Sequence, residues 1–411
     1  MKLSVIICVY NTPKEYLSAC LDSITKSTVK DIDGGYEICM VDDGSSVDYS
    51  DLIEKHGIRV TKTENKGILS ARTTGAKMAS GEYAVYCDSD DTVSFNYYLP
   101  MVEKAEETGA DIVINDWATH TQRARYYAKK DDTIRFDIDV SGDENLLEYL
   151  RNEGRQHAYF VLWNKIYKTE LLRGSIDNII RAGIDERCSY SEDAAINFFA
   201  WRDAKRVVNI HTGFYFYRIH PTQSVNVASK EKLCSQIDSM AKTLDIMRGG
   251  IRENVNKDAL LLHIDRWAQL MARYHYSVAR GAKYTELYPY IREKYGVEKL
   301  KLSTTKDSSS YETKVLIGDN FNDVDNALLS LWNGEKEYFS KTKHPDKYTE
   351  NSLEYMRKKN KIRENPSSTT SIPKFRNSFK KKVFYNRIIN KTAGFFFKKG
   401  SKSREFLKKF M

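Results

Sequence analysis

An acidic string, Asp-Ser-Asp-Asp, occupies positions 88–91 directly after the apolar segment Tyr83–Cys87. That segment predicts a strand buried on both faces. Carboxylates two positions apart at a strand end can converge on a hard divalent cation, which prefers oxygen ligands. The cation would bridge the two phosphates of a nucleoside diphosphate and neutralise charge as this group departs. An acidic turn that caps the next helix would use the same residue types.

A second acidic string, Val-Asp-Asp-Gly-Ser, occupies positions 41–45 after another apolar segment. A carboxylate at a strand end, such as that of Asp42, can accept a hydrogen bond from a base N–H, as the N3–H of uracil would offer. Gly44 permits a tight turn. A loop that supplies an N-cap for the following helix explains the string equally well. Its position beside the first acidic string favours a binding site.

Strand and helix signals alternate from residue 1 to about residue 116, and this alternation predicts a doubly wound α/β sheet. The predicted strands are Leu3–Tyr10, Tyr36–Val41, Ile58–Thr63, Tyr83–Cys87 and Asp111–Ile114. The predicted helices begin at Pro13 and span Ile68–Ala79 and Leu99–Thr108. Ligands bind outside the carboxyl ends of the strands in such sheets. Both acidic strings and Tyr10 fall at such ends.

The pattern from about residue 230 to residue 340 is mainly helical. An apolar stripe at helical spacing predicts packing; it comprises Leu260, Leu261, Ile264, Trp267, Ala268, Met271 and Tyr274. A loop rich in Ser and Thr follows at 303–310, and Asn365–Pro373 resembles a linker. We therefore expect three parts: a catalytic domain at 1–228, a helical accessory domain at 229–355 and a tail at 356–411.

Short strings in a specific order along residues 1 to about 225 resemble the family-2 glycosyltransferases, whose fold is called GT-A. The matching strings are Ser4–Asn11, Val41–Ser45, Asn65–Gly67 with Ala71 and Arg72, Gly81–Tyr83, Asp88–Asp91, Trp163–Tyr167, Ser191–Asp193 and Tyr217–His220. The resemblance implies a GT-A domain with a mixed, doubly wound sheet that binds a nucleotide sugar. It also implies transfer of the sugar to a hydroxyl group with inversion at the anomeric carbon.

The resemblance implies roles for the residues near the nucleotide. Tyr10 and Asp42 would hold the base, with Asp43 close by. Asn65 and Arg72 would lie near the base and the diphosphate. The resemblance favours uridine diphosphate as the nucleotide of the donor. The sequence does not identify the sugar that the donor carries.

Further roles concern the diphosphate and its metal, Mn²⁺ or Mg²⁺. Asp88 would contact the ribose and Asp90 the metal. Arg218 and His220 would come from a flexible segment that closes over the diphosphate. His220 would add a metal ligand, although a surface loop explains this histidine nearly as well. Ser224 would touch phosphate.

The resemblance also implies a general base. Asp193, in a pair with Glu192, would take the proton of the acceptor hydroxyl. Such an acidic pair beside a metal and a dry pocket can have its pKa values tuned for this task. The Q-x-x-R-W signature of processive synthases is absent from the sequence. We therefore expect one sugar to be transferred per encounter.

Two other classes of protein fit less well. A sugar-phosphate nucleotidyltransferase would need a Gly-rich phosphate loop near the N-terminus, but residues 3–15 contain no Gly. A nucleic-acid-binding protein could use the basic tail, but this function leaves the acidic strings unexplained. We expect no nucleic-acid partner. The acceptor is expected to be a saccharide, a lipid-linked saccharide or a polymer of teichoic-acid type from the cell envelope or capsule, with a protein acceptor as the alternative.

The charge of the chain is concentrated in its tail. Arg357–Met411 carries 18 Lys and Arg residues and two acidic residues, a net charge of +16, which leaves −7 for the rest. Large aromatic residues, including the run Phe395–Phe397, lie among these basic residues. This composition predicts an amphipathic segment that binds an anionic membrane surface. A solvated tail or a subunit contact in a homo-oligomer would have the same composition.

The cysteines and the apolar segments of the sequence indicate the cellular compartment. The six Cys residues include no C-x-x-C pair, which favours reduced core cysteines over a disulfide framework or zinc site. No signal peptide is recognisable, and no apolar stretch approaches the roughly 20 residues that span a bilayer. We expect a cytoplasmic protein held at the inner face of the cell membrane.

Overall fold

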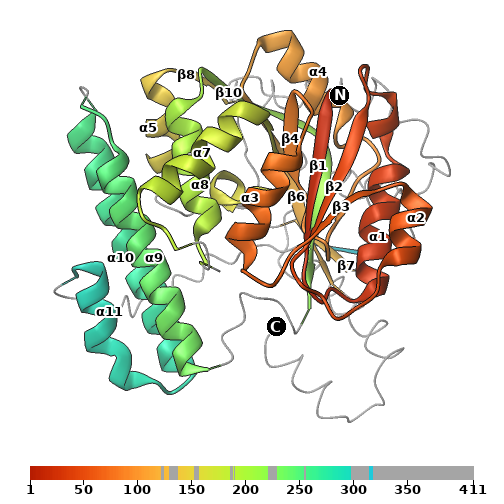
Figure 1. The fold of residues 1–411 in the computed structure, drawn as a ribbon. Helices are drawn as coiled ribbons and strands as arrows, with labels where there is room; N and C mark the ends of the chain where they lie inside the picture. Colours follow the sequence, from red (N-terminus) through yellow and green to blue (C-terminus); the bar gives the residue numbers. More distant parts are fainter. Residues whose placement is uncertain are drawn as a thin grey trace, which may run out of the picture. The chain divides into compact units, whose positions relative to one another are not determined.

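The computed structural model describes residues 1–121, 125–128, 138–151, 157–185, 188, 190–220, 229–253, 256–297 and 314–317. All of these residues belong to one compact unit, Met1–Met356 (Figure 1). The predicted Ser- and Thr-rich loop, the linker and the basic tail lie outside the described residues. Within the described ranges, every helix is too short or too polar to cross a bilayer.

A mixed sheet forms the centre of this unit, in the order β11-β7-β6-β9-β4-β1-β2-β3, with β10 pairing to β5, β6 and β8. The strands are β1 (Leu3–Val9), β2 (Tyr36–Asp42), β3 (Arg59–Lys62), β4 (Tyr83–Tyr86), β5 (Thr92–Val93), β6 (Ile112–Thr121), β7 (Arg125–Ala128), β8 (Asp139–Ser141), β9 (Lys165–Lys168), β10 (Arg206–Ile219) and β11 (Lys314–Ile317). The mixed, doubly wound sheet that the sequence predicts is therefore confirmed.

The parallel part of the sheet fixes where a ligand can bind. β1 pairs in parallel with both β2 and β4, and β2 pairs in parallel with β3. The chain first moves from β1 outward to β2 and β3, and then returns to the other side of β1 as β4. The strand order thus reverses between β1 and β4, and ligands of doubly wound sheets bind at the carboxyl ends of such strands.

Helices pack against this sheet and against one another. Those before residue 204 are α1 (Lys14–Thr25), η1 (Thr28–Asp31), α2 (Ser50–His56), α3 (Ile68–Met78), α4 (Leu99–Thr108), α5 (Asp143–Arg151), α6 (His157–Phe160), α7 (Thr169–Arg181) and α8 (Glu192–Asp203). α3 packs against β1 and β2. At Gly75 this helix approaches β1 so closely that a Cβ atom would collide with the Ile6 side chain. The close approach brings the buried face of α3 next to the carboxyl ends of the strands.

The predicted helical region follows β10 and comprises α9 (Lys230–Gly250), α10 (Lys257–Gly281), η2 (Thr285–Leu287) and α11 (Tyr288–Tyr295). α9 and α10 lie side by side (Figure 1), and they pack against α8 and α5 respectively. In the predicted stripe, Leu260, Ile264, Trp267 and Ala268 are buried. The prediction is wrong for Tyr274, which is 48% exposed, because the buried face of α10 continues through Ala272, His275 and Ala279 instead.

Candidate active site

Asp88, Asp90 and Asp91 form a tight turn directly after β4. The Asp91 amide donates a hydrogen bond of 3.0 Å to the Asp88 carbonyl oxygen, and the Asp88 amide donates one of 2.9 Å to the hydroxyl of Tyr215 on β10. The side chains of Asp88 and Asp90 keep 32% and 29% of their surface accessible. Asp91 is completely buried. The turn therefore presents two carboxylates to a ligand and uses the third as an anchor.

The buried carboxylate of Asp91 holds the end of β10 on this turn. It accepts a hydrogen bond of 2.6 Å from the Arg218 amide, and Arg218 Nε donates one of 2.6 Å to the Asp90 carbonyl oxygen. The Arg218 guanidinium lies 4.5 Å from the ring centroid of Tyr16 on α1, a cation–π distance. Arg218 thus belongs to a strand end fixed on the acidic turn. The sequence placed Arg218 and His220 in a flexible segment, whereas the structure places Arg218 in β10 and His220 directly after it; residues 221–228 lie outside the described residues.

The two residues predicted to bind a metal lie next to each other. His220 Nε2 is 2.7 Å from Asp90 Oδ2, and the His220 ring is buried against Tyr16. No group of three or more potential metal-ligating side chains occurs in the part of the chain that the structure describes. A carboxylate suits Mg²⁺ or Mn²⁺, and Mg²⁺ commonly combines one or two protein ligands with substrate phosphates. Asp90 and His220 fit a cation completed by a bound diphosphate.

Arg72 on α3 connects the acidic turn to a second acidic pair. Its buried guanidinium forms an ion pair with Glu192 through Nη1, and Nη2 lies 3.8 Å from Asp88 Oδ1. The Tyr86 hydroxyl donates a hydrogen bond of 2.8 Å to the Arg72 carbonyl oxygen. Burial raises the pKa of Asp88 above its usual range, and the charge of Arg72 opposes this rise. One cation therefore balances carboxylates from two distant segments.

Glu192 and Asp193 are the first two residues of α8. Burial raises the pKa of Glu192 to about 7, against the opposing charge of Arg72. Burial also raises the pKa of Asp193, and Arg72 again opposes the rise. Asp193 Oδ1 accepts a hydrogen bond of 2.8 Å from the Ala194 amide, and a helix N-terminus favours negative charge. Carboxyl groups with pKa values raised toward neutrality suit proton transfer.

Asp43 organises the loop that leads into α3. One oxygen accepts hydrogen bonds from the Thr63 hydroxyl at 3.1 Å and the Lys66 amide at 3.0 Å, and the other accepts one of 2.9 Å from the Gly67 amide. Asp43 itself is buried. These bonds fix the course of the loop that carries Asn65. The contacts of Asp43 are therefore structural, and they set the position of a residue predicted to lie near the base.

Asp42 and Asn11 shape the neighbouring strand ends. Asp42 is buried at the end of β2, where its Oδ1 accepts a hydrogen bond of 2.9 Å from the Ser45 amide. Asn11 adopts a left-handed φ of 50° and accepts a hydrogen bond of 2.8 Å from the Ser46 amide. Tyr10 directly follows β1 and is 55% exposed. Its ring is accessible to a flat ligand at the predicted base-binding edge.

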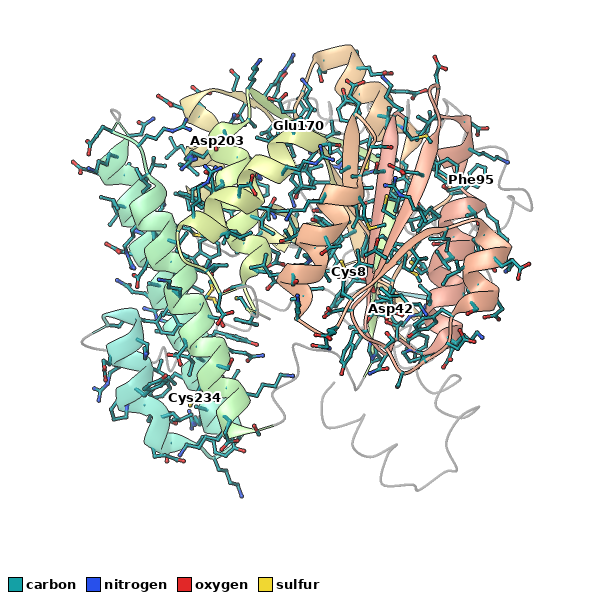
Figure 2. The ribbon with its side chains drawn as sticks, in the orientation of Figure 1. Cys8, Asp42, Phe95, Glu170, Asp203 and Cys234 are labelled. Atoms are coloured by element: carbon teal, nitrogen blue, oxygen red, sulfur yellow. The ribbon has the colours of Figure 1, made fainter. Side chains whose placement is uncertain are left out.

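Cys8 on β1 lies close enough to both the acidic turn after β4 and the loop after β2 to respond to charges from each. Burial raises the pKa of its thiol to about 12; the charge of Arg72 opposes the rise, and those of Asp88 and Asp43 add to it. Figure 2 labels Cys8 and Asp42 close together at the carboxyl end of the parallel strands. Contacts and charge interactions bring together seven predicted site residues, Arg72, Asp88, Asp90, Glu192, Asp193, Arg218 and His220. Four others, Tyr10, Asp42, Asp43 and Asn65, lie at or after the ends of the neighbouring strands β1, β2 and β3. Ser224 lies outside the described residues.

Lys165 is a residue near the site to which the sequence assigned no role. It is fully buried, and its ammonium donates hydrogen bonds to the carbonyl oxygens of Ala158 at 2.6 Å and Val161 at 2.5 Å, and to Asn164 Oδ1 at 2.6 Å. Burial lowers the pKa of Lys165 well below its usual range, and the charge of Asp193 opposes this. A lysine that follows Asn164 in the mainly apolar run 158–167 was the signal for a buried amine.

Known proteins resemble this chain over part of its length. The uncharacterized glycosyltransferase EpsJ of Bacillus subtilis (strain 168) is 29% identical over 234 residues, which cover 56% of this chain and 64% of EpsJ. Glycosyltransferase GlyA of Streptococcus pneumoniae serotype 4 is 29% identical over 261 residues, which cover 60% of this chain and 34% of GlyA. The chain thus spans less than two thirds of the length of these two relatives.

A solved structure supports the fold assignment. The crystal structure of S. aureus TarS 1–349 in complex with UDP-GlcNAc matches with a TM-score of 0.51 and 19% identity, over 72% of this chain and 88% of that chain. The observed strand order and this likeness agree with the GT-A fold. Residues 4–174 match the sequence model of glycosyl transferase family 2. In this part of its length the chain is therefore similar to glycosyl transferase family 2.

Proposed function

We propose that this protein is a metal-dependent, inverting glycosyltransferase that moves a sugar from a nucleoside diphosphate sugar to an acceptor hydroxyl. The bridge that Arg72 forms between Asp88 and Glu192 carries this proposal. Asp88 lies at the strand edge where a nucleotide would bind, and Glu192 precedes a candidate general base. A transferase needs both groups in one site because its two substrates must meet there. The complex of TarS with UDP-GlcNAc supports UDP as the nucleotide.

The donor would lie across the carboxyl ends of β1, β2 and β4. Tyr10 and Asp42 would hold the base, and the loop ordered by Asp43 would bring Asn65 to the same region. Asp88 would accept a hydrogen bond from the ribose. Arg72, Arg218 and Ser224 would contact the diphosphate, whose negative charge suits guanidinium groups.

Asp90 and His220 would hold the divalent cation. When bound, the cation stabilises negative charge on the diphosphate as it leaves. Arg218 stands beside this pair on the same acidic turn. It would add positive charge where the leaving group develops its own negative charge.

Asp193 would act as the general base. Its carboxylate takes the proton of the acceptor hydroxyl while the hydroxyl oxygen attacks the anomeric carbon. The bond between that carbon and the diphosphate oxygen breaks, and the nucleoside diphosphate leaves with the bonding electrons. A single displacement inverts the anomeric centre and needs no protein nucleophile. Glu192 and Arg72 would keep the base oriented beside the donor.

The acceptor would be a glycan of the bacterial cell envelope or capsule, including polymers of teichoic-acid type. Both bacterial relatives carry glycosyltransferase names, which supports a bacterial glycan. Residues 229–355 would form an accessory domain, and the basic tail from residue 356 would hold the enzyme at the inner face of the membrane. A protein acceptor is the alternative, and acceptor competition assays would separate the two.

A donor screen tests the proposed activity. Purified protein is incubated with Mn²⁺ and individual nucleotide sugars, and release of nucleoside diphosphate is measured. We expect turnover with at least one UDP-sugar and at least tenfold less with the corresponding GDP-sugar. The Asp193→Asn variant serves as the matched control, because it keeps the donor-binding edge intact. Equal release by the wild type and this variant, or no release with any donor, would contradict the proposal.

A further inference from the structure

The start of α8 is fastened to the helical region through one buried threonine. Thr243 lies in the middle of α9 and is completely buried. Its Oγ1 is 3.0 Å from the hydroxyl oxygen of Ser191, the residue directly before Glu192 and Asp193. The Ser191 hydroxyl donates its own hydrogen to the Tyr190 carbonyl oxygen at 2.5 Å. With that hydrogen directed at Tyr190, the hydroxyl hydrogen of Thr243 is directed at Ser191, whose hydroxyl oxygen lies 3.0 Å and whose carbonyl oxygen lies 3.5 Å from Thr243 Oγ1.

Ser191 adopts a backbone conformation that a serine seldom takes. Its φ is 65° and its ψ is 7°, in the left-handed region, whereas an N-cap serine normally has extended dihedral angles. An ordinary N-cap serine also accepts a hydrogen bond from an amide of the first turn, but Ser191 makes no such bond. The unusual conformation persists only where the surroundings hold it. Thr243 supplies that contact from outside the helix.

α9 is fixed to α8 at the other end as well. Arg202 Nη1 donates a hydrogen bond of 3.1 Å to the Gly250 carbonyl oxygen at the end of α9. A Cβ at Gly250 would lie 2.7 Å from a ring carbon of Phe198, so the two helices are in close contact there. α10 reaches the same segment through His275, whose ring centroid lies 6.0 Å from that of Tyr190. The helical region therefore contacts both ends of the helix that carries the acidic pair.

We propose that Thr243 is a positioning residue: by donating a hydrogen bond to Ser191, it fixes the first turn of α8 and thereby the direction of the Asp193 carboxylate. This inference rests on the proposed function of Asp193 as general base. It gives the helical region a role in the active site, which is to hold in place the helix that carries the proposed base. A base that is displaced by a fraction of an ångström loses its alignment with the acceptor hydroxyl, and rate is lost without loss of donor affinity.

The test compares three variants of the full-length protein. Thr243→Val removes the hydroxyl at nearly constant volume, and Thr243→Ser keeps the hydroxyl and removes the methyl group. Thr108→Val is the matched control, because Thr108 is likewise a helical threonine whose hydroxyl donates a hydrogen bond, here within α4, at 2.6 Å to the Lys104 carbonyl oxygen. We expect Thr243→Val to lower kcat about tenfold while the donor KM changes by less than about twofold. Thr243→Ser should recover most of kcat, and Thr108→Val should leave it unchanged.

Several results would overturn the inference. Wild-type kcat in Thr243→Val would show that the hydroxyl positions nothing. Equal losses in Thr243→Val and Thr243→Ser would show that a hydroxyl at position 243 does not sustain the rate, and would assign the effect to the packing of the whole side chain. If Thr243→Val does not fold, Ser191→Gly replaces it, because glycine adopts the left-handed conformation readily and lacks the hydroxyl. Wild-type kcat in folded Ser191→Gly would also refute the role. Inactivity of the wild-type protein with every donor would instead refute the proposed function.

Discussion

Arg72 on α3 forms a buried ion pair with Glu192 at the start of α8, although the two residues are 120 positions apart. The side chains keep 8% and 7% of their surface accessible, so water contributes little to their stabilisation. Each charge needs the other because an unpaired buried charge is costly. The pair therefore couples the donor-binding edge to the acidic pair, and its energetics can be measured.

Replacement of Arg72 by Met should destabilise the protein by about 3 kcal/mol or more near neutral pH, because Glu192 would be left buried without a partner. Urea unfolding followed by circular dichroism measures this loss. The double variant Arg72→Met with Glu192→Gln removes both charges and should recover much of the lost stability. If the double variant is as unstable as the single one, the cost comes from lost packing around Arg72.

The raised pKa of Glu192 predicts a pH dependence of stability. Burial raises this pKa from 4.5 to about 7, so the folded protein retains a proton that the unfolded chain releases earlier. Stability should therefore fall as pH rises from about 4.5 to about 7, by up to about 3 kcal/mol. Urea unfolding of the wild type and Glu192→Gln at pH 5 and pH 8 measures the difference. Parallel profiles of the two proteins would show that Glu192 does not titrate in this window.

Substitution of Asp193 by Asn should abolish transfer while donor binding persists. The amide oxygen of asparagine can still accept the hydrogen bond from Ala194, so the start of α8 should keep its shape, but it cannot take a proton. We expect a loss in kcat of about 10²-fold or more and a nearly unchanged Kd for UDP by titration calorimetry. A wild-type transfer rate in this variant would place the base elsewhere.

The sequence predicted the strand-end residues of the site well. An apolar run such as β1, buried almost throughout, has a distinct pattern, and polar residues after such strands meet at one edge. The expected positions of Asp42, Asp88 and Asp90 followed from this rule. Their detailed contacts did not, because the donors that occupy Asp43 come from a loop whose course depends on tertiary packing.

Contacts between segments that are distant along the chain could not be predicted from the sequence. Nothing in the pattern around Arg72 indicates Glu192 as its partner, and nothing around Thr243 indicates Ser191. The strands β9 and β10 were also missed, since their short or irregular apolar patterns resemble those of other elements. A register shift between Asn209 and Phe214 interrupts the alternation along β10. Such irregularity is set by the neighbouring strand and leaves a weak signal in the sequence.

The proposed cation site predicts that metal binding depends on the nucleotide. Asp90 and His220 supply only two protein ligands, so Mn²⁺ alone should bind weakly and UDP should strengthen its binding. Titration of Mn²⁺ followed by electron paramagnetic resonance, with and without UDP, measures this. Chelation should abolish turnover, and Asp90→Ala should be inactive. Equal Mn²⁺ affinity with and without UDP, or full activity in Asp90→Ala, would contradict the site.

The last prediction concerns the tail, whose charge suggests a membrane anchor. Residues 357–411 carry +16 and the rest of the chain −7, so attraction to anionic lipid should come from the tail alone. Each basic residue near such a surface contributes about 1 kcal/mol. A protein truncated after Met356 should keep turnover on a small acceptor and lose it on a lipid-embedded one, because the proposed site residues all precede residue 225.

Co-sedimentation with liposomes measures the role of the tail directly. The full-length protein should sediment with anionic but not neutral liposomes, and added salt should weaken binding because exposed charges are screened beyond about 10 Å at 0.1 M. A full-length variant with Phe395, Phe396 and Phe397 changed to Ser keeps the charge and removes apolar area. It should bind more weakly than the intact protein and keep the same salt sensitivity, because its charged groups are unchanged. Equal sedimentation of the truncated and full-length proteins would assign the tail to a protein or subunit contact instead.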